Sequence, residues 1–267
     1  MADSIRAFAV IAGAWVRASM TYRASFWSLA VGQALFTLVD FVAITIMFSH
    51  IDRLGGFDVA QVALLYGFSG FALGVADLLV GNVELLGRRV RDGSFDAMLV
   101  RPVAPLVQVA ADQFALRRLG RIVSAVGVLG WALVATNIDW SITKVAVAVA
   151  TLVSGSVIFC SVFVLGSAFQ ILAGDASEMM NAFTYGGNTL TQYPLSIYPS
   201  EVVKGVTFIL PLAFVNWYPA LYILGVEDPF DMPVAFHFAS PVAATLLAAV
   251  AAGCWRAGVR RYRSTGS

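Results

Sequence analysis

Two carboxylates, Asp40 and Asp77, lie inside long apolar stretches of the chain. An acid inside an apolar helix is costly, and where it occurs it serves a proton relay, an interhelical hydrogen bond or the lining of a wet cavity. Asp40 lies eight residues, and Asp77 eighteen residues, from the predicted outer end of its stretch. At about 1.5 Å per residue these depths differ by roughly 15 Å. On neighbouring upright helices the two acids are therefore not expected to form one site.

Motifs for catalysis or metal binding are missing from the sequence. Its two lysines, Lys144 and Lys204, do not follow a GxxxxG run, which excludes a phosphate-binding loop of the Walker A type. The histidines are isolated and the cysteines form no CxxC pair, so no metal site is predicted and the cysteines are expected to be small buried apolar residues. These four residues are His50, His237, Cys160 and Cys254. We expect neither enzymatic activity nor a bound cofactor in this chain itself.

A charged island interrupts the apolar sequence at residues 88–102. Its arginines alone would serve as an orientation signal for a membrane protein; they are Arg88, Arg89, Arg91 and Arg101. The residues between them indicate more. Gly93 permits a tight turn. Apolar residues then recur at helical spacing, behind polar residues that favour a helix start and ahead of prolines that end it. The apolar set is Phe95, Met98 and Leu99, the polar set is Asp92, Ser94 and Asp96, and the prolines are Pro102 and Pro105. The pattern predicts a short helix whose apolar face docks into a protein groove.

A second unusual segment covers residues 185–199. It contains two Tyr-Pro pairs, Tyr193-Pro194 and Tyr198-Pro199, as well as Gly186-Gly187, and this composition is expected to exclude a regular helix. A polar segment of weak charge suits a gate, a re-entrant piece or a binding surface beside a pathway. An ordered connecting loop is the alternative.

The elements that must position these residues are membrane helices. The chain is 59% hydrophobic and only 12% charged, whereas soluble domains carry about 25% charged residues. We predict an all-α polytopic membrane protein with a single transmembrane domain over residues 1–267, and the net charge of +1 gives no reason to expect a nucleic-acid partner. Arginines on one stripe of residues 4–23 predict an amphipathic helix lying in the interface within residues 1–24. The six predicted spans are 26–48, 59–83, 122–136, 142–173, 202–225 and 234–255, with a cytoplasmic region at 84–121 that includes a helix over 106–121.

The distribution of basic residues predicts the orientation. With the N-terminus inside, fifteen of the seventeen Lys and Arg residues fall at inner span ends, Lys204 among them, and only Arg53 and Lys144 fall outside. Both termini are therefore expected in the cytoplasm, with the chain as a multi-pass membrane protein.

Three segments together resemble a known family. They are the island at 88–102, the run TyrProLeuSerIleTyrPro at 193–199 and the run at 211–225, which includes Asn216. In this order they are similar to the ABC-2-type permeases, more narrowly to the six-span membrane subunits of bacterial exporters. The resemblance implies an elbow helix, six transmembrane helices in a type V-like arrangement and a coupling helix between spans two and three. Gly93, Phe95, Leu99, Arg101 and Pro102 match that coupling element.

The resemblance also implies partners: two ATPase subunits that bind ATP and magnesium, and a second six-span permease that is identical or a sister chain. One departure concerns the re-entrant helices that such permeases carry before the last span, because the predicted outer loop at 226–233 is too short for them. The remaining candidates for a pathway or gate, besides the two acids, are Tyr193, Pro194, Tyr198, Pro199 and Asn216.

The expected function is export of an amphipathic or lipophilic substrate, such as a drug, an antibiotic or a lipid. The first alternative is a proton-coupled secondary transporter that uses Asp40 and Asp77, although such proteins have acids at matching depth and internal repeats. The second alternative is a membrane scaffold without transport, which would leave the segment 185–199 unexplained.

Overall fold

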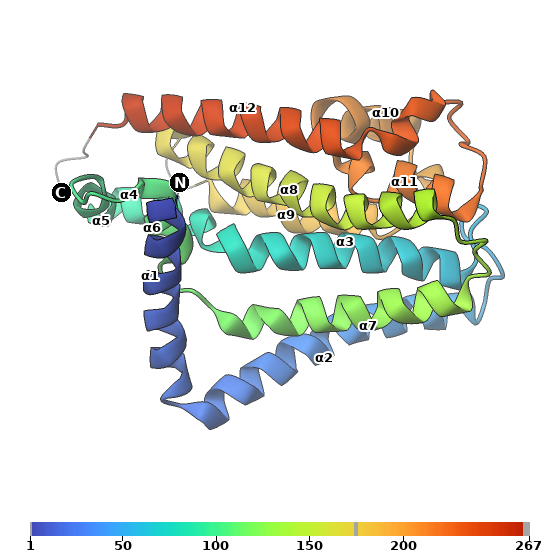
Figure 1. The fold of residues 1–267 in the computed structure, drawn as a ribbon, viewed down its shortest axis with the longest axis horizontal. Coiled ribbons are helices and arrows are strands. Elements are labelled where there is room, and N and C mark those ends of the chain that lie inside the picture. Colours follow the sequence, from blue (N-terminus) through green and yellow to red (C-terminus); the bar gives the residue numbers. More distant parts are fainter. Residues whose placement is uncertain (1, 174–175, 264–267) are drawn as a thin grey trace.

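The computed structural model describes residues 2–173 and 176–263, and the regular elements in that part of the chain are helices (Figure 1). Five of them are long and apolar enough to cross a membrane. These are α2 (Arg23–Phe48), α3 (Val59–Val80, continued by further turns to Arg91), α7 (within Leu116–Ala135), α8 (Ile142–Ala173) and α12 (Ser240–Arg261). The chain is thus an all-α polytopic membrane protein, as predicted.

The bundle is organised around α3 and α8. Helix α3 packs against α7 and α8, and α12 packs along α8 on the far side (Figure 1). Small residues allow the close approach that helices use in membranes. A side chain at Gly67 of α3 would collide with the backbone of Leu129 in α7, and one at Gly155 of α8 would press on Ala72 of α3. These glycines fix the positions of α7 and α8 on α3.

Helix α1 (Ala2–Met20) lies across the end of the bundle, roughly at right angles to the other helices (Figure 1). It packs on α6 (Pro105–Ala111), and the ring of Phe8 meets that of Phe114 at 5.9 Å in an edge-to-face contact. The helix predicted within residues 1–24 is therefore present. It is attached to the region that carries the island.

The fifth crossing of the bundle is not where the sequence predicted it. Helix α9 (Ser177–Thr191) starts at the island end, where α8 finishes, and runs alongside α3 and α8. Beyond it, the Ser196 hydroxyl donates to the Gly55 carbonyl at 2.8 Å, and Gly55 belongs to the α2–α3 loop at the opposite end. Residues 177–197 thus traverse the molecule. The expectation that Gly186-Gly187 excludes a regular helix was wrong, because α9 passes through both glycines.

Residues 202–225, predicted to be one span, instead form short helices that fold back on themselves (Figure 1), and we call them the re-entrant segment. It consists of α10 (Ser200–Lys204), a π-helical turn to Ile209, a bend with a 3-10 turn at Leu212–Val215, and α11 (Trp217–Leu224). Its tip is anchored inside the bundle, since the Asn216 amide donates to the carbonyls of Leu65 at 2.9 Å and Thr191 at 2.6 Å. The loop at 226–233 is short, and α10 and α11 lie directly ahead of it. The prolines at 211 and 219 explain why an apolar run of this length is not one helix.

The region between α3 and α7 also differs from prediction. A helix over 106–121 was expected, but α6 ends at Ala111 and the chain turns through Gln113, which has a φ of 57°. A 3-10 turn at Leu116–Arg118 then leads into α7 (Leu119–Ala135). The third span therefore begins at Leu119 rather than inside a long cytoplasmic helix.

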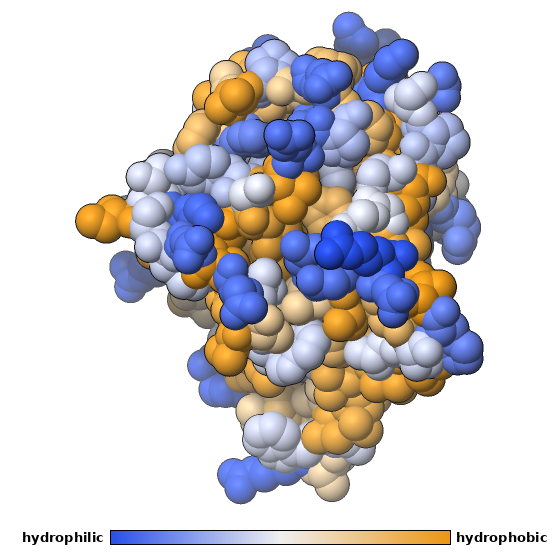
Figure 2. Space-filling model, turned by 90° about the vertical axis from the view of Figure 1, so that its right-hand side faces the viewer, coloured by the Kyte–Doolittle hydropathy of each residue, from blue (hydrophilic) through white to orange (hydrophobic). Residues whose placement is uncertain are grey.

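The end of the bundle opposite the island carries the α2–α3, α7–α8 and α11–α12 connections. In Figure 2, which views that end, hydrophilic residues stand between apolar ones. The island lies at the other end, beyond α1 in Figure 1.

Candidate functional site

The island folds as two short helices joined by a tight turn. Helix α4 (Leu86–Arg91) ends at Asp92, Gly93 has the left-handed φ of 72°, and α5 (Ser94–Leu99) follows. The Asp92 carboxylate accepts from the Ser94 backbone N–H at 2.9 Å and from its hydroxyl at 2.6 Å. These hydrogen bonds from Ser94 hold the pKa of Asp92 below its usual value. The predicted glycine turn and short helix are confirmed.

A buried arginine locks the island onto the preceding and following elements. Arg89 donates through Nη1 to the Asp112 carboxylate, and the same nitrogen lies 3.9 Å from the Met98 sulfur. The Gln108 amide donates to the Met98 carbonyl at 2.8 Å and to the Val103 carbonyl at 2.7 Å, which ties α5 to α6. Of the four island arginines, Arg89 is thus a structural anchor, while Arg88, Arg91 and Arg101 are exposed.

The apolar residues of α5 do not form an exposed docking face. Phe95 is fully buried, and its ring meets the ring of Tyr262, just after α12, at 5.2 Å and 82°. Met98 is also buried and Leu99 is half-buried. Burial and the nearby Asp96 carboxylate raise the pKa of Tyr262 to about 12, so this hydroxyl stays neutral at physiological pH.

The apolar face of α5 is buried because of contacts with segments distant in the sequence. The spacing of Phe95 and Met98 predicted an apolar stripe correctly, but the returning C-terminal segment and α6 cover it. The large apolar side chain that the island does expose is Val100, at 85% of its full surface, and the next two residues, Arg101 and Pro102, are exposed as well.

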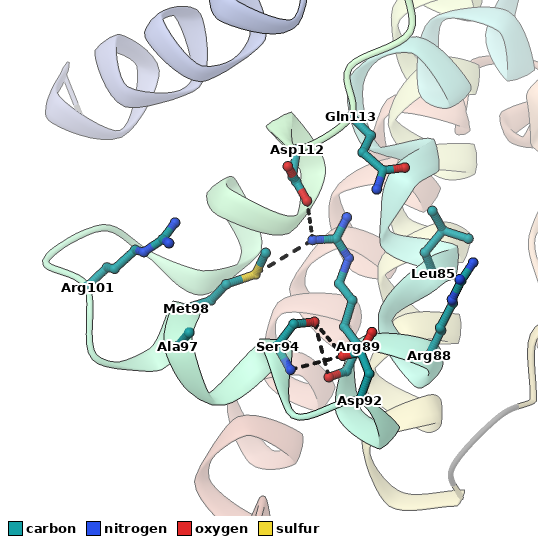
Figure 3. A pocket seen from close by; sticks show the side chains of 10 residues that line it. All are labelled: Leu85, Arg88, Arg89, Asp92, Ser94, Ala97, Met98, Arg101, Asp112 and Gln113. Carbon is teal, nitrogen blue, oxygen red and sulfur yellow. Dashed lines mark hydrogen bonds and ion pairs between the residues drawn. The ribbon is translucent and has the colours of Figure 1, made fainter. Parts of the chain in front are cut away.

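A pocket of about 460 Å³ opens between α4, α5 and the turn after α6 (Figure 3). Three arginines and two acids dominate its lining, and Figure 3 shows Arg88 and Arg101 on opposite sides of the Arg89 guanidinium. The full lining is Leu85, Arg88, Arg89, Asp92, Ser94, Ala97, Met98, Arg101, Asp112 and Gln113. The prominence of Asp112 and Gln113 was not apparent from the sequence, because both lie outside the island and reach it through the turn after α6.

The acid Asp77 is held in a network of charges near the island end of α3. Its two carboxylate oxygens lie 3.2 Å from Arg118 Nε and 3.1 Å from Arg121 Nη1. The Tyr185 hydroxyl lies 3.4 Å from Asp77 and 3.5 Å from Glu84. With both oxygens paired, Asp77 is an interhelical tie between α3, α7 and α9, which is one of the roles predicted for it.

The second acid, Asp40, is exposed on α2 and lines a polar pocket of about 200 Å³. Arg121 and Tyr185 line the same pocket, so Arg121 lies between the environments of the two acids. The two acids were expected to be apart, and the structure places Asp77 in the ion-pair network and Asp40 at the pocket. Arg121 was not among the predicted site residues, although its place at the start of an apolar span was a signal in the sequence. The pocket is lined by Phe36, Thr37, Asp40, Tyr66, Gly70, Leu73, Arg121, Tyr185, Asn188, Thr189 and Gln192.

The remaining gate candidates gather at the opposite end. Pro194 is buried, Tyr193 and Tyr198 are half-buried and Pro199 is exposed, all in the connection between α9 and α10. Asn216 lies deeper, at the tip of the re-entrant segment. It is close to a cluster in which the Ser69 hydroxyl contacts Asn188 Oδ1 at 2.8 Å and Thr191 Oγ1 at 2.5 Å.

Metal ligation was not expected, and among the described residues no group of three or more His, Cys, Asp or Glu is placed to hold a metal ion. His50 lies beside the Ser49 hydroxyl at 3.0 Å, and the His237 ring lies 6.2 Å from the ring of Tyr222. Cys160 is half-buried, whereas Cys254 is exposed, which corrects the expectation that both are buried.

The comparisons with known proteins add one finding. The model of a family described as ABC-2 family transporter protein matches residues 34–266. The comparisons with curated proteins and with solved structures found no match.

Proposed function

The chain belongs to the ABC-2 transporter family and is thus a membrane component of an ABC transporter, and from this premise we propose that it forms the export pathway driven by a separate ATPase docked on the island. ATP and magnesium would bind on that ATPase, in keeping with the missing phosphate-binding loop. The observation that carries this proposal is the island itself: a compact element beyond the end of the bundle, fastened to several helices (Figure 1).

The fastening makes the island suitable for transmitting force. Helix α4 follows α3 without a loop, and the Gly87 backbone N–H donates to the Gln170 side chain of α8 at 2.7 Å. Phe95 joins it to the segment after α12 through Tyr262. A displacement of the island by a closing ATPase pair would therefore move α3, α8 and α12 together, which is how a switch of access from one side to the other would begin.

The exposed part of the island defines where the ATPase would bind. Val100, Arg101 and Pro102 are accessible, whereas Phe95 is not. Substituting Phe95 would therefore disturb the folding of the island, and Val100 is the better position for testing the interface.

The basic residues support an orientation with the island in the cytoplasm. Since α10 lies at the opposite end, Lys204 moves to the outer group, and fourteen of the seventeen Lys and Arg residues remain at the island end. The outer group is then Arg53, Lys144 and Lys204. This asymmetry follows the positive-inside rule, and both termini would be cytoplasmic.

Asp40 supports a pathway along α2, closed by a second permease. An ionisable residue on a membrane helix almost always faces a bundle interior or a water-filled cavity, yet Asp40 is exposed in this single chain. Its apolar neighbours Phe36 and Val39 are exposed as well. A second copy or a sister chain over this face would enclose Asp40 and the adjoining pocket, giving a polar lining between apolar walls that suits an amphipathic or lipophilic substrate.

Proton coupling through the two acids is less well supported by the geometry. A relay carboxylate must exchange protons, but both oxygens of Asp77 are paired with guanidinium groups.

The energy source tests the proposed function directly. The complex is purified through a tag on this chain, reconstituted in proteoliposomes, and assayed for ATP hydrolysis in the presence of a panel of lipophilic cations and lipids. We expect hydrolysis that these compounds stimulate and that a protonophore leaves unchanged. A preparation without ATP hydrolysis, with dye movement that follows an imposed proton gradient, would support the secondary transporter instead.

A further inference from the structure

The 460 Å³ pocket beside the island has more positive than negative side chains in its lining (Figure 3). Asp92 is satisfied by Ser94, and Asp112 is paired with Nη1 of Arg89. The Arg89 side chain is only 8% exposed, and its Nη2, which is shielded from solvent, makes no hydrogen bond among the described residues. The charge of Arg89 is balanced within the chain by Asp112.

The rim of the pocket adds positive charge. Arg88 and Arg101 are exposed on either side of the buried guanidinium. Three guanidinium groups thus face two carboxylates that are already engaged, which leaves the pocket with a net positive charge. The guanidinium geometry is suited to carboxylates and phosphates, which accept two parallel hydrogen bonds.

The size and position of the pocket favour a protein side chain as the occupant. Its volume lies toward the small end of the roughly 300–1,000 Å³ typical of ligand sites, enough for one or two side chains. Helices α4 and α5 lie beyond the plane of the interfacial helix α1 in Figure 1, farther from the bundle than the level at which lipid headgroups would meet α1. Val100, exposed next to Arg101, offers an apolar contact at the side of the pocket.

We propose that this pocket receives acidic side chains of the ATPase subunit, whose carboxylates pair with the exposed guanidinium groups of Arg88 and Arg101 at its rim. Arg89, paired with Asp112, forms part of the pocket wall beside these two arginines. The assignment rests on the proposed function, because it presupposes an ATPase bound at the island. It specifies the chemistry of that contact: ion pairs between acids and arginines beside the apolar contact at Val100.

Zero-length chemical coupling tests which group enters the pocket. Arg101→Lys and Arg88→Lys each place an amine at the rim without removing its charge, and both positions are exposed, so folding is preserved. The purified complex of each variant is treated with a carbodiimide, which joins an amine to a carboxylate in direct contact. We expect mass spectrometry to find an amide between the introduced lysine and an acid of the ATPase. Arg256→Lys, exposed on α12, is the matched control and is expected to give no such product.

Charge reversal gives a second, quantitative measure. Arg101→Glu and Arg88→Glu should each weaken retention of the ATPase by at least about tenfold, and more in low salt than in high salt. Arg256→Glu should leave retention unchanged.

The outcomes separate the pocket from the proposed function. If the wild-type complex contains the ATPase but no coupling above the Arg256→Lys control occurs and charge reversal has no effect, the pocket assignment is wrong and the function stands. If the reversal variants keep the ATPase but lose co-purified anionic phospholipid in native mass spectrometry, the pocket binds a lipid phosphate and the assignment is likewise overturned. If the wild-type chain binds no ATPase at all, both fall together.

Discussion

Arg121 is the residue that connects the polar interior of this protein. It pairs with Asp77 at 3.1 Å, its guanidinium lies 5.4 Å from the centre of the Tyr185 ring, and it lines the pocket that contains Asp40. Intramembrane acids were recognisable in the sequence, but their different surroundings were not. The partners of Asp77 come from α7 and α9, more than forty residues away along the chain. One acid is therefore a structural tie, and the other remains available to a pathway.

This difference predicts that the same substitution has a large effect on stability at Asp77 and a small one at Asp40. Asp77→Asn should destabilise the protein by about 3 kcal/mol, because it leaves two largely buried guanidinium groups without a counter-charge. Asp40→Asn, at an exposed site, should change stability little. Unfolding of both variants in detergent, followed by circular dichroism, measures the two values. Equal stabilities for the two variants would contradict the structural role of Asp77.

At the scale of the elements, the re-entrant segment shows where sequence patterns stop being informative. Residues 202–225 are apolar and long enough to span a membrane, so hydropathy alone favours a crossing. The structure bends them at a π-helical turn and anchors Asn216 to α3 and α9. The first four spans, the interfacial helix and the Gly93 turn follow from local patterns of hydropathy, charge and backbone freedom. The direction in which Phe95 points, and the side on which α10 lies, depend on contacts with distant segments.

If residues 202–225 were a span, α10 would lie on the cytoplasmic side; as a re-entrant segment, they place α10 on the outer side. In a background without Cys160 and Cys254, Lys204→Cys and Glu227→Cys place single cysteines near the two ends of the re-entrant segment. We expect a membrane-impermeant maleimide to label both from outside intact cells, while Arg101→Cys reacts only after permeabilisation. If the cysteines at 204 and 227 react from opposite sides, residues 202–225 form a span after all.

For the molecule as a whole, α2 presents an exposed apolar face that no other helix in the described part of the single chain covers. Exposed residues on α2 include the large apolar side chains Leu35, Phe36, Val39 and Val42 in addition to Asp40. Lipid would cover the apolar residues well but would leave the acid in an unfavourable environment. A second permease along this face satisfies both.

A photo-reactive residue on this face identifies what covers it. Phe36 replaced by benzoylphenylalanine should form an adduct with a second permease chain when cells are illuminated, and the mass of the adduct distinguishes an identical copy from a sister chain. The same replacement at Leu246, exposed on α12, serves as the control and should react with lipid. An adduct at position 246 but none at position 36 would place the partner on α12 instead.

The docking of a motor on the island is the central claim, and retention of the ATPase by an island variant tests it most directly. The complex is purified through a tag on this chain, and the ATPase subunit and ATP hydrolysis are measured for the wild type, for Val100→Asp and for Val234→Asp, an exposed position at the opposite end. Val100→Asp would place a charge where the ATPase is expected to bury an apolar side chain. We therefore predict that this variant retains less than about a tenth of the ATPase. Val234→Asp should retain all of it. Full retention and full hydrolysis with Val100→Asp would contradict docking at the island.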